Sequence, residues 1–177
     1  KSGINLYLRT AKGVKHSLRG SDFETAAEKY RDNIYAIAFN FFKNSSDADD
    51  VVQDVLLKLY RTERTFESDE HVRNWLLRVA VNQCKKISIS SWFRKNMPLE
   101  EYAESLQYET PEESDLFFAV MALPKKYRAI VHLYYYEDYS TREIAEMLRL
   151  KEPTVRTRLL RARKTLKERL SDVWNEE

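Results

Sequence analysis

The residues best suited to bind a charged polymer lie between positions 149 and 170 of this 177-residue chain. This stretch carries nine Lys or Arg and only two Glu. On a helix that turns about 100° per residue, one face carries cationic, hydroxyl and methyl groups, from Arg156, Thr157, Leu160, Arg161 and Lys164. In the DNA major groove an Arg can bind a guanine edge through two hydrogen bonds, and a Leu or Thr methyl can contact a thymine methyl. The pattern therefore predicts a helix that reads duplex DNA.

A helix-turn-helix is expected to position this face. Ser140 and Glu143 have the spacing of a capping box, which satisfies the first free N–H groups of a helix. Pro153 suits the first position of the next helix, because its missing N–H has no partner to lose there. The apolar stripe of that helix recurs at steps of three and four, at Val155, Leu159, Ala162, Leu166 and Leu170. A basic helix alone is more often a solvated surface, and the three signals together favour DNA binding.

The turn itself carries one unusual residue. Arg149 stands where Gly would tolerate a positive φ at lower cost. Either Arg149 adopts a left-handed conformation, at a cost of about 1 kcal/mol, or the turn has a slightly different geometry.

Composition predicts an all-α protein. There are only three Gly and four Pro, and 43% of the residues are hydrophobic, which is enough for one domain or two small ones. The formal net charge is only +2, so the segregation of charge along the chain is more informative than its total. A single cysteine, Cys84, excludes an internal disulfide and favours a reducing compartment. No apolar run approaches the roughly 18 residues that span a bilayer, and no signal peptide is visible. We therefore expect a cytoplasmic protein that does not insert into a membrane.

Charge and helix signals divide the chain into four parts. Residues 1–20 hold five Lys or Arg and no acid, as expected of a basic N-terminal arm or a vector remnant. Residues 21–95 carry amphipathic helical patterns and form a first domain. Residues 96–111 form an acidic linker, since the stretch 96–116 has seven Asp or Glu and no Lys or Arg. Residues 112–177 form a second small helical domain, which ends in the helix-turn-helix.

The first domain offers two polar surfaces. A helix after residue 47 has an outward face that is either solvated or a docking surface for a basic partner, made of Asp50, Gln53, Asp54 and Lys58. A later helix, residues 73–86, presents basic and amide groups outward at Arg78, Asn82, Lys85 and Lys86. Unpaired bases stack on aromatic rings while cations hold the phosphates. Phe66, alone in the polar connection before this helix, is either a wedge against a base or a plug over the local core.

Two separate patches resemble one family. The segment DADDVVQDVLLKLYR, followed by NWLLRVAVN, resembles domain 2 of bacterial RNA polymerase sigma factors. The segment LPKKYRAIVHLYYYEDYSTREIAEML, with TVRTRLLRARKTL after it, resembles their domain 4. The short length and the absence of other sigma domains are similar to the extracytoplasmic-function group. The chain departs from the family pattern at Arg149 and Pro153, where glycines are common, and in the acidic residues 67–70.

This resemblance implies a transcription initiation factor that binds core RNA polymerase, recognises −35 and −10 promoter elements and assists promoter opening. It assigns the −35 bases to Arg156, Thr157, Leu160 and Arg161, and DNA phosphates to Thr141, Arg158, Arg163 and Lys164. It assigns the unpaired −10 strand to Phe66, Arg78, Asn82, Lys85 and Lys86. Asp50, Gln53, Asp54 and Lys58 would meet the clamp helices of the largest polymerase subunit, with the flap as a second contact. An anti-sigma protein clasped around both domains is a further expected partner.

The residues by themselves leave other interpretations open. A helix-turn-helix regulator whose first domain dimerises or senses a ligand would bind palindromic duplex sites and would not bind core polymerase. A helical adaptor that binds only proteins would show no salt-sensitive binding to DNA. An enzyme fits least, because His16, His71 and His132 are scattered, Cys84 has no evident partner and no Gly-rich phosphate loop is present. No catalytic residue, metal or cofactor is expected.

Overall fold

The computed structural model describes residues 16–17, 21–90 and 110–174, and only the backbone of residues 16–17, 21, 88–90 and 172–174. The basic arm of residues 1–20, apart from His16–Ser17, and the acidic linker up to residue 109 lie outside the described residues. The part described is helical, as predicted, apart from two very short strands. These strands, β1 (His16–Ser17) and β2 (Thr65–Phe66), pair antiparallel with His16 opposite Phe66.

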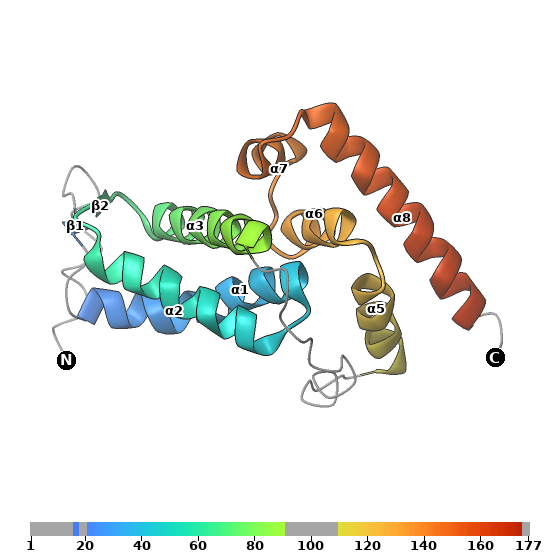
Figure 1. The fold of residues 1–177 in the computed structure, drawn as a ribbon, viewed down its shortest axis with the longest axis horizontal. Coiled ribbons are helices and arrows are strands. Elements are labelled where there is room, and N and C mark those ends of the chain that lie inside the picture. Colours follow the sequence, from blue (N-terminus) through green and yellow to red (C-terminus); the bar gives the residue numbers. More distant parts are fainter. Residues whose placement is uncertain (1–15, 18–20, 91–109, 175–177) are drawn as a thin grey trace, which may run out of the picture.

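The first helical unit contains α1 (Ser21–Phe42), α2 (Ser45–Arg61) and α3 (Asp69–Ser90), which pack against one another (Figure 1). Helix α3 begins four residues earlier than the position predicted from the sequence. Ser68 explains the difference, because its Oγ accepts a hydrogen bond from the N–H of His71 at 3.1 Å. A serine cap followed by two acids is a favourable helix start, so Asp69 and Glu70 belong to the first turn rather than to a loop.

Helix α2 begins at a polar cap and buries one apolar face. Asn44 caps the helix by accepting a hydrogen bond from the N–H of Asp47 at 2.8 Å. The buried stripe runs through Val51, Val52, Val55 and Leu59. The helical spacing of Tyr60 from Val52 and Leu56 predicts an inward side chain, but Tyr60 is 71% exposed, because it lies about 100° around the helix from Leu59.

The second unit contains α5 (Pro111–Met121), α6 (Lys125–Tyr135), α7 (Thr141–Leu148) and α8 (Glu152–Trp174). Thr110 caps α5 by accepting a hydrogen bond from the N–H of Glu113 at 3.3 Å, and Pro111 lies in the first turn. Helix α8 begins one residue before the predicted position. It forms a long rod along one side of the molecule, with α7 at its N-terminal end (Figure 1).

The two units touch along a seam. Helix α1 packs against α6, and α3 contacts α7 (Figure 1). One cluster of buried apolar side chains extends through both units, with Ile37 and Leu77 in the first and Ile130 and Ile144 in the second. Within the described residues, no helix has the length and apolar character needed to cross a membrane.

Candidate nucleic-acid and polymerase interfaces

The turn between α7 and α8 fixes how the second helix is presented. The N–H of Ser140 donates to Glu143 Oε2 at 2.9 Å and the N–H of Glu143 donates to Ser140 Oγ at 3.3 Å, so the predicted capping box is present. Hydrogen bonds from Ser140 also hold the pKa of Glu143 below its usual range. Arg149 has φ 55° and ψ 50°, so it adopts the left-handed conformation, the first of the two options left open by the sequence. Its N–H and that of Leu150 close the helix end by donating to carbonyls of α7, including Ala145 O at 2.9 Å from Leu150 N.

The four residues predicted to contact bases share one exposed face of α8. Leu160 is 67% exposed, and Arg156, Thr157 and Arg161 are exposed beside it. The opposite face is buried through Val155, Leu159 and Ala162. Leu160 is thus an apolar side chain that lies among exposed polar and cationic groups on the solvent-facing side of the helix.

Glu152 organises the start of this face, and sequence reasoning missed it. Its Oε1 accepts hydrogen bonds from Thr141 Oγ1 at 2.8 Å and from Arg156 Nη2 at 2.6 Å. The hydrogen bond from Thr141, followed by that from Arg156, lowers the pKa of Glu152. One carboxylate thus links the first turn of α7 to the first turn of α8. The i, i+4 spacing of Glu152 and Arg156 is the sequence signal that would have found part of this contact.

The residues predicted to hold phosphates fall into separate groups. Arg158 and Arg161 line a shallow hollow of about 380 Å³ together with Lys126 of α6, which sequence reasoning did not assign. Arg163 lies further along α8, where its Nε donates to Tyr135 Oη at 2.6 Å and its guanidinium packs on the rings of Tyr134 and Tyr135. The hydrogen bond to Tyr135 raises the pKa of Arg163.

The remaining two residues of the phosphate set are also paired within the second unit. Thr141 is held by Glu152, as described above, and Lys164 lies 3.8 Å from Glu168 one turn later. The structure therefore brings Thr141 next to Arg156, and it separates Arg163 from both.

The face of α3 predicted to bind a single strand lies partly beneath α7. Arg78, Asn82 and Lys86 are exposed, whereas Lys85 is half-buried. Lys85 Nζ donates to Leu148 O at 3.1 Å, and Arg78 Nη2 lies 3.9 Å from Glu146 Oε2. Burial, together with the nearby charge of Arg149, lowers the pKa of the Lys85 ammonium group.

Phe66 is separate from that face. Its side chain is only 3% exposed, and it makes edge contacts with the rings of His71 at 5.3 Å and Trp75 at 5.5 Å. In this conformation it is a plug over the local core, the second of the two roles considered for it.

The predicted docking face of α2 is exposed and has an apolar centre. Asp50, Gln53 and Lys58 are exposed and Asp54 is half-buried. Gln83 of α3 connects two of them: its Nε2 donates to Asp54 Oδ2, and its Oε1 accepts from Lys58 Nζ at 2.6 Å. The sequence analysis assigned neither Gln83 nor Leu57, which is 44% exposed in the middle of this face. The sequence signal that would have found Leu57 is its helical spacing, seven residues after Asp50 and three after Asp54, which places it on the same face.

Comparison with known proteins decides the family. Residues 26–96 match the family described as sigma-70 region 2, and residues 116–166 match sigma-70 region 4. The extracytoplasmic-function RNA polymerase sigma factor SigM of Mycobacterium tuberculosis is 30% identical over 146 residues, which cover 81% of this chain and 74% of the relative. The chain belongs to the extracytoplasmic-function sigma factors.

Other relatives agree with this assignment. The RNA polymerase sigma factor SigV of Bacillus subtilis is 27% identical over 154 residues, covering 83% of this sigma factor and 90% of the relative. The fold is similar to that of the sigma factor RpoE from Bartonella quintana, solved in complex with the anti-sigma factor NepR. The TM-score is 0.65 at 20% identity, covering 86% of this chain and 98% of that one.

As a member of this family, the sigma factor binds core RNA polymerase and promoter elements through regions 2 and 4, and it is not an enzyme. The interpretations as a polymerase-independent regulator and as a protein-only adaptor are therefore set aside. Cys84 is buried, and its burial raises the pKa of the thiol to about 12. No group of His, Cys, Asp or Glu suited to hold a metal ion occurs among residues 16–17, 21–90 and 110–174.

Proposed function

We propose that this sigma factor reads the −35 element as duplex DNA with the outer face of α8. Arg156, Thr157, Leu160 and Arg161 would contact base edges. The observation that carries this proposal is that all four are solvent-exposed while the opposite face of the same helix is buried. Glu152 supports it, because a salt-bridged Arg156 is held in a defined position before DNA arrives.

Phosphate contacts would surround the base-reading face. Thr141 and Arg158 flank the first turns of α8, and Lys164 and Arg163 follow its length. Lys126, which shares a hollow with Arg158 and Arg161, extends this set from α6. Such contacts hold the register of the protein on DNA but carry no sequence information.

The α3 face would hold the unpaired −10 strand and so assist promoter opening. Arg78, Lys85 and Lys86 supply charge for phosphates, and Asn82 supplies an amide that can pair with a base edge. A protein that captures an unstacked base offsets the energy of opening the duplex. We leave the ring of Phe66 out of this set, since its burial denies it to a base in this conformation.

The α2 face would dock on the clamp helices of the largest polymerase subunit. Its acids would meet basic groups, and Leu57 would provide the apolar centre that energetically important contacts favour. Region 4 would meet the flap. Since polymerase and promoter DNA are cytoplasmic in bacteria, we infer that the protein acts there.

An anti-sigma protein is a further proposed partner. RpoE, which shares this fold, was solved bound to the anti-sigma factor NepR. The fold match covers 86% of this chain and 98% of that one, so we expect a protein that contacts both regions of this chain to inhibit it.

The test is reconstituted transcription. Purified chain, core RNA polymerase and a linear promoter template should yield run-off transcripts of defined length, and the chain should co-migrate with core enzyme on gel filtration. A chain that neither co-migrates with core polymerase nor supports transcription from any genomic promoter fragment would remove the proposal.

A further inference from the structure

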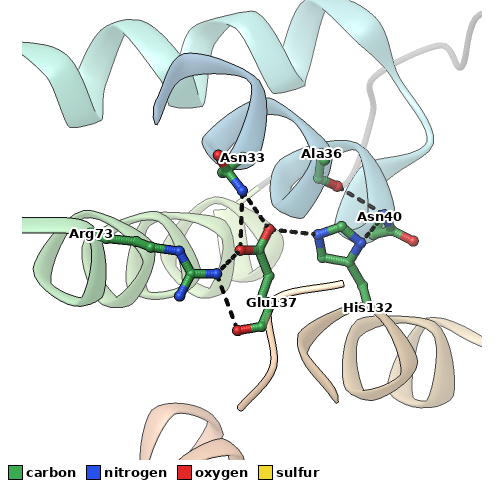
Figure 2. A network of polar contacts seen from close by, with 6 residues as sticks. All are labelled: Asn33, Ala36, Asn40, Arg73, His132 and Glu137. Atoms are coloured by element: carbon green, nitrogen blue, oxygen red, sulfur yellow. Dashed lines mark hydrogen bonds and ion pairs between the residues drawn. The ribbon is translucent and has the colours of Figure 1, made fainter. Parts of the chain in front are cut away.

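Glu137 and Glu152 both accept hydrogen bonds from side chains of another helix. Glu137 is only 2% exposed at the seam, where Asn33 Nδ2 and Arg73 Nη2 donate to it at 3.2 and 2.7 Å (Figure 2). A buried carboxylate needs such donors, because burial without them is unfavourable. The side chain of Glu152 is 32% exposed at the start of α8, where water can satisfy a carboxylate. Burial therefore does not explain the hydrogen bonds to Glu152.

Three side-chain donors converge on one oxygen of Glu152. Its Oε1 accepts from Thr141 Oγ1 at 2.8 Å, from Arg156 Nη2 at 2.6 Å and from Arg156 Nε at 3.1 Å. Thr141 is the first residue of α7, and Arg156 lies one turn into α8. The carboxylate is thus tied to one helix and holds a side chain of the other. The hydrogen bond from Thr141, followed by that from Arg156, lowers the pKa of Glu152, so the group is ionised near pH 7.

This contact decides which donors of Arg156 remain for DNA. A guanidinium carries five N–H groups in a rigid plane. Glu152 accepts from Nε and from Nη2, which form one edge of that plane. No described residue accepts from the adjacent edge, formed by Nη1 and the second N–H of Nη2. Two parallel donors on that edge match O6 and N7 of guanine, whereas each other base presents at most one acceptor there.

Without Glu152, the Arg156 side chain would be free to choose other partners. It is 69% exposed, and a long side chain loses much rotamer freedom when DNA holds it. It could also bind a phosphate, which carries no sequence information. Fixing one such side chain before binding avoids a cost that corresponds to about twofold to tenfold in affinity. An exposed ion pair contributes little to stability, so the value of this one lies in orientation.

Other cations of α8 lack this arrangement. Lys164 lies 3.8 Å from Glu168, at the same spacing of four residues, as an ion pair without a hydrogen bond and without a contact from α7. Arg161 has no hydrogen bond or ion pair to any residue that the structure describes. The helix therefore offers an acid that orients a cation and a second acid, Glu168, that only lies beside one.

We propose that Glu152 is the positioning residue for Arg156: it directs the free edge of that guanidinium at one guanine of the −35 duplex. The inference rests on the proposed −35 role of α8 and deepens it. An acid beside DNA also repels phosphates, so Glu152 weakens binding to any duplex while it raises the preference for guanine at one position. These two effects differ in sign, which separates positioning from simple affinity.

The test uses holoenzyme formed from the full chain and core polymerase. Its templates keep one active promoter except for a randomised −35 segment, and sequencing of the bound templates gives the base preference at each position. Wild type should select a guanine at one position where Arg156→Ala shows no preference. Glu152→Gln keeps the shape of the side chain and removes its charge. It should lower that guanine preference about fivefold and raise binding to templates of random sequence.

Controls on the same helix isolate the orientation of Arg156. Glu168→Gln makes the same charge change and should raise binding to random templates without altering any base preference. The preference that Arg161→Ala removes should persist in Glu152→Gln, because Arg161 does not contact Glu152. The double variant Glu152→Gln/Arg156→Ala should match Arg156→Ala alone, since Glu152 acts through Arg156. Circular dichroism checks that every variant is folded.

Two further measurements distinguish positioning from a structural role. Replacing the selected guanine by 7-deazaguanine removes the N7 acceptor, so it should weaken binding by wild type, weaken it less in Glu152→Gln and leave Arg156→Ala unchanged. Thr141→Val removes the hydroxyl that anchors Glu152 and should lower the guanine preference at the same position. Loss of a phosphate contact alone would instead lower affinity for all templates equally.

The outcomes separate the inference from the function on which it rests. If Glu152→Gln binds every template more tightly and keeps all base preferences, Glu152 only masks Arg156, and the inference is wrong while the −35 role stands. A double variant with less preference than Arg156→Ala at other positions would also contradict it. A wild-type holoenzyme without any base preference across the −35 segment would overturn the proposed −35 role of α8, and the inference with it.

Discussion

At the scale of single residues, side-chain partners decide what each cation on α8 can do. Arg156 is paired with Glu152, and Arg163 is held by Tyr135, with distances of 2.6 Å in both cases. Arg161 lies between them on an exposed turn and lines the hollow shared with Lys126. A guanidinium can bind the two acceptors of a guanine edge with little rearrangement. Arg161 is therefore the cation whose removal should report base reading most directly.

We expect Arg161→Ala to lower transcription from a −35-dependent promoter by about tenfold or more, since a bidentate contact to a base contributes about 1–3 kcal/mol of discrimination. Run-off transcription and gel-filtration binding to core polymerase measure the two effects separately, and core binding should be unchanged. Arg169→Ala, at an exposed position near the end of the same helix, is the matched control and should transcribe as wild type. Equal loss of transcription and of core binding in Arg161→Ala would contradict the assigned role.

Residue exposure on long helices could be predicted from the sequence, because the apolar stripe fixes the opposite face. Arg156, Thr157, Leu160 and Arg161 are all exposed as that stripe requires. The orientation of Phe66 could not be predicted, because a short connection has no period from which to read a face. Its burial depends on His71 and Trp75 of the helix that follows.

At the scale of elements, the boundaries follow from caps and turns that the sequence shows only in part. The capping box of Ser140 and Glu143 predicted the start of α7 directly, and Pro153 predicted the start of α8 to within one residue. The start of α3 was predicted too late, because Ser68 was assigned to a polar connection although its hydroxyl accepts the N–H of His71. The end of α7 is the costly position, since Arg149 has a φ of 55°, where a residue with a Cβ is strained.

Arg149→Gly should therefore stabilise the protein. Glycine adopts positive φ without the Cβ clash, so the free energy of unfolding should rise by about 1 kcal/mol. The midpoint of urea denaturation, followed by circular dichroism, measures the change. Arg31→Gly is the opposite control: position 31 lies in the interior of α1, where glycine should destabilise by about 1 kcal/mol. A lower midpoint for Arg149→Gly would show that contacts of the Arg149 side chain outweigh the backbone strain.

At the scale of the whole molecule, regions 2 and 4 present separate surfaces to different partners, and they also pack against each other. The sequence could predict the two surfaces, because each surface lies on one helix with a clear period. It could not predict the seam, because Glu137 is one acid in the short connection YEDYS and Asn33 and Arg73 lie on predicted helices whose partners were unknown. Such long-range polar contacts have no local signature.

Because the two regions bind different partners, a substitution in one region should impair the binding of that region alone. Asp54→Arg should weaken association with core polymerase, because it reverses a charge at the centre of the α2 face and removes the acceptor for Gln83. Duplex −35 binding should stay as in wild type, since α8 lies in the other region and α2 packs on α1 and α3 of its own region. Fluorescence anisotropy with core enzyme and with a −35 duplex measures the two affinities on one preparation. Both are measured at a single stated salt concentration, because phosphate contacts make DNA affinity salt-dependent.

The matched control is Glu28→Arg, which makes the same charge change on an exposed turn of α1 and should affect neither affinity. If Asp54→Arg binds core polymerase as wild type does, the α2 face is not the docking surface, whereas parallel loss of both affinities would show that the two regions act as one binding unit.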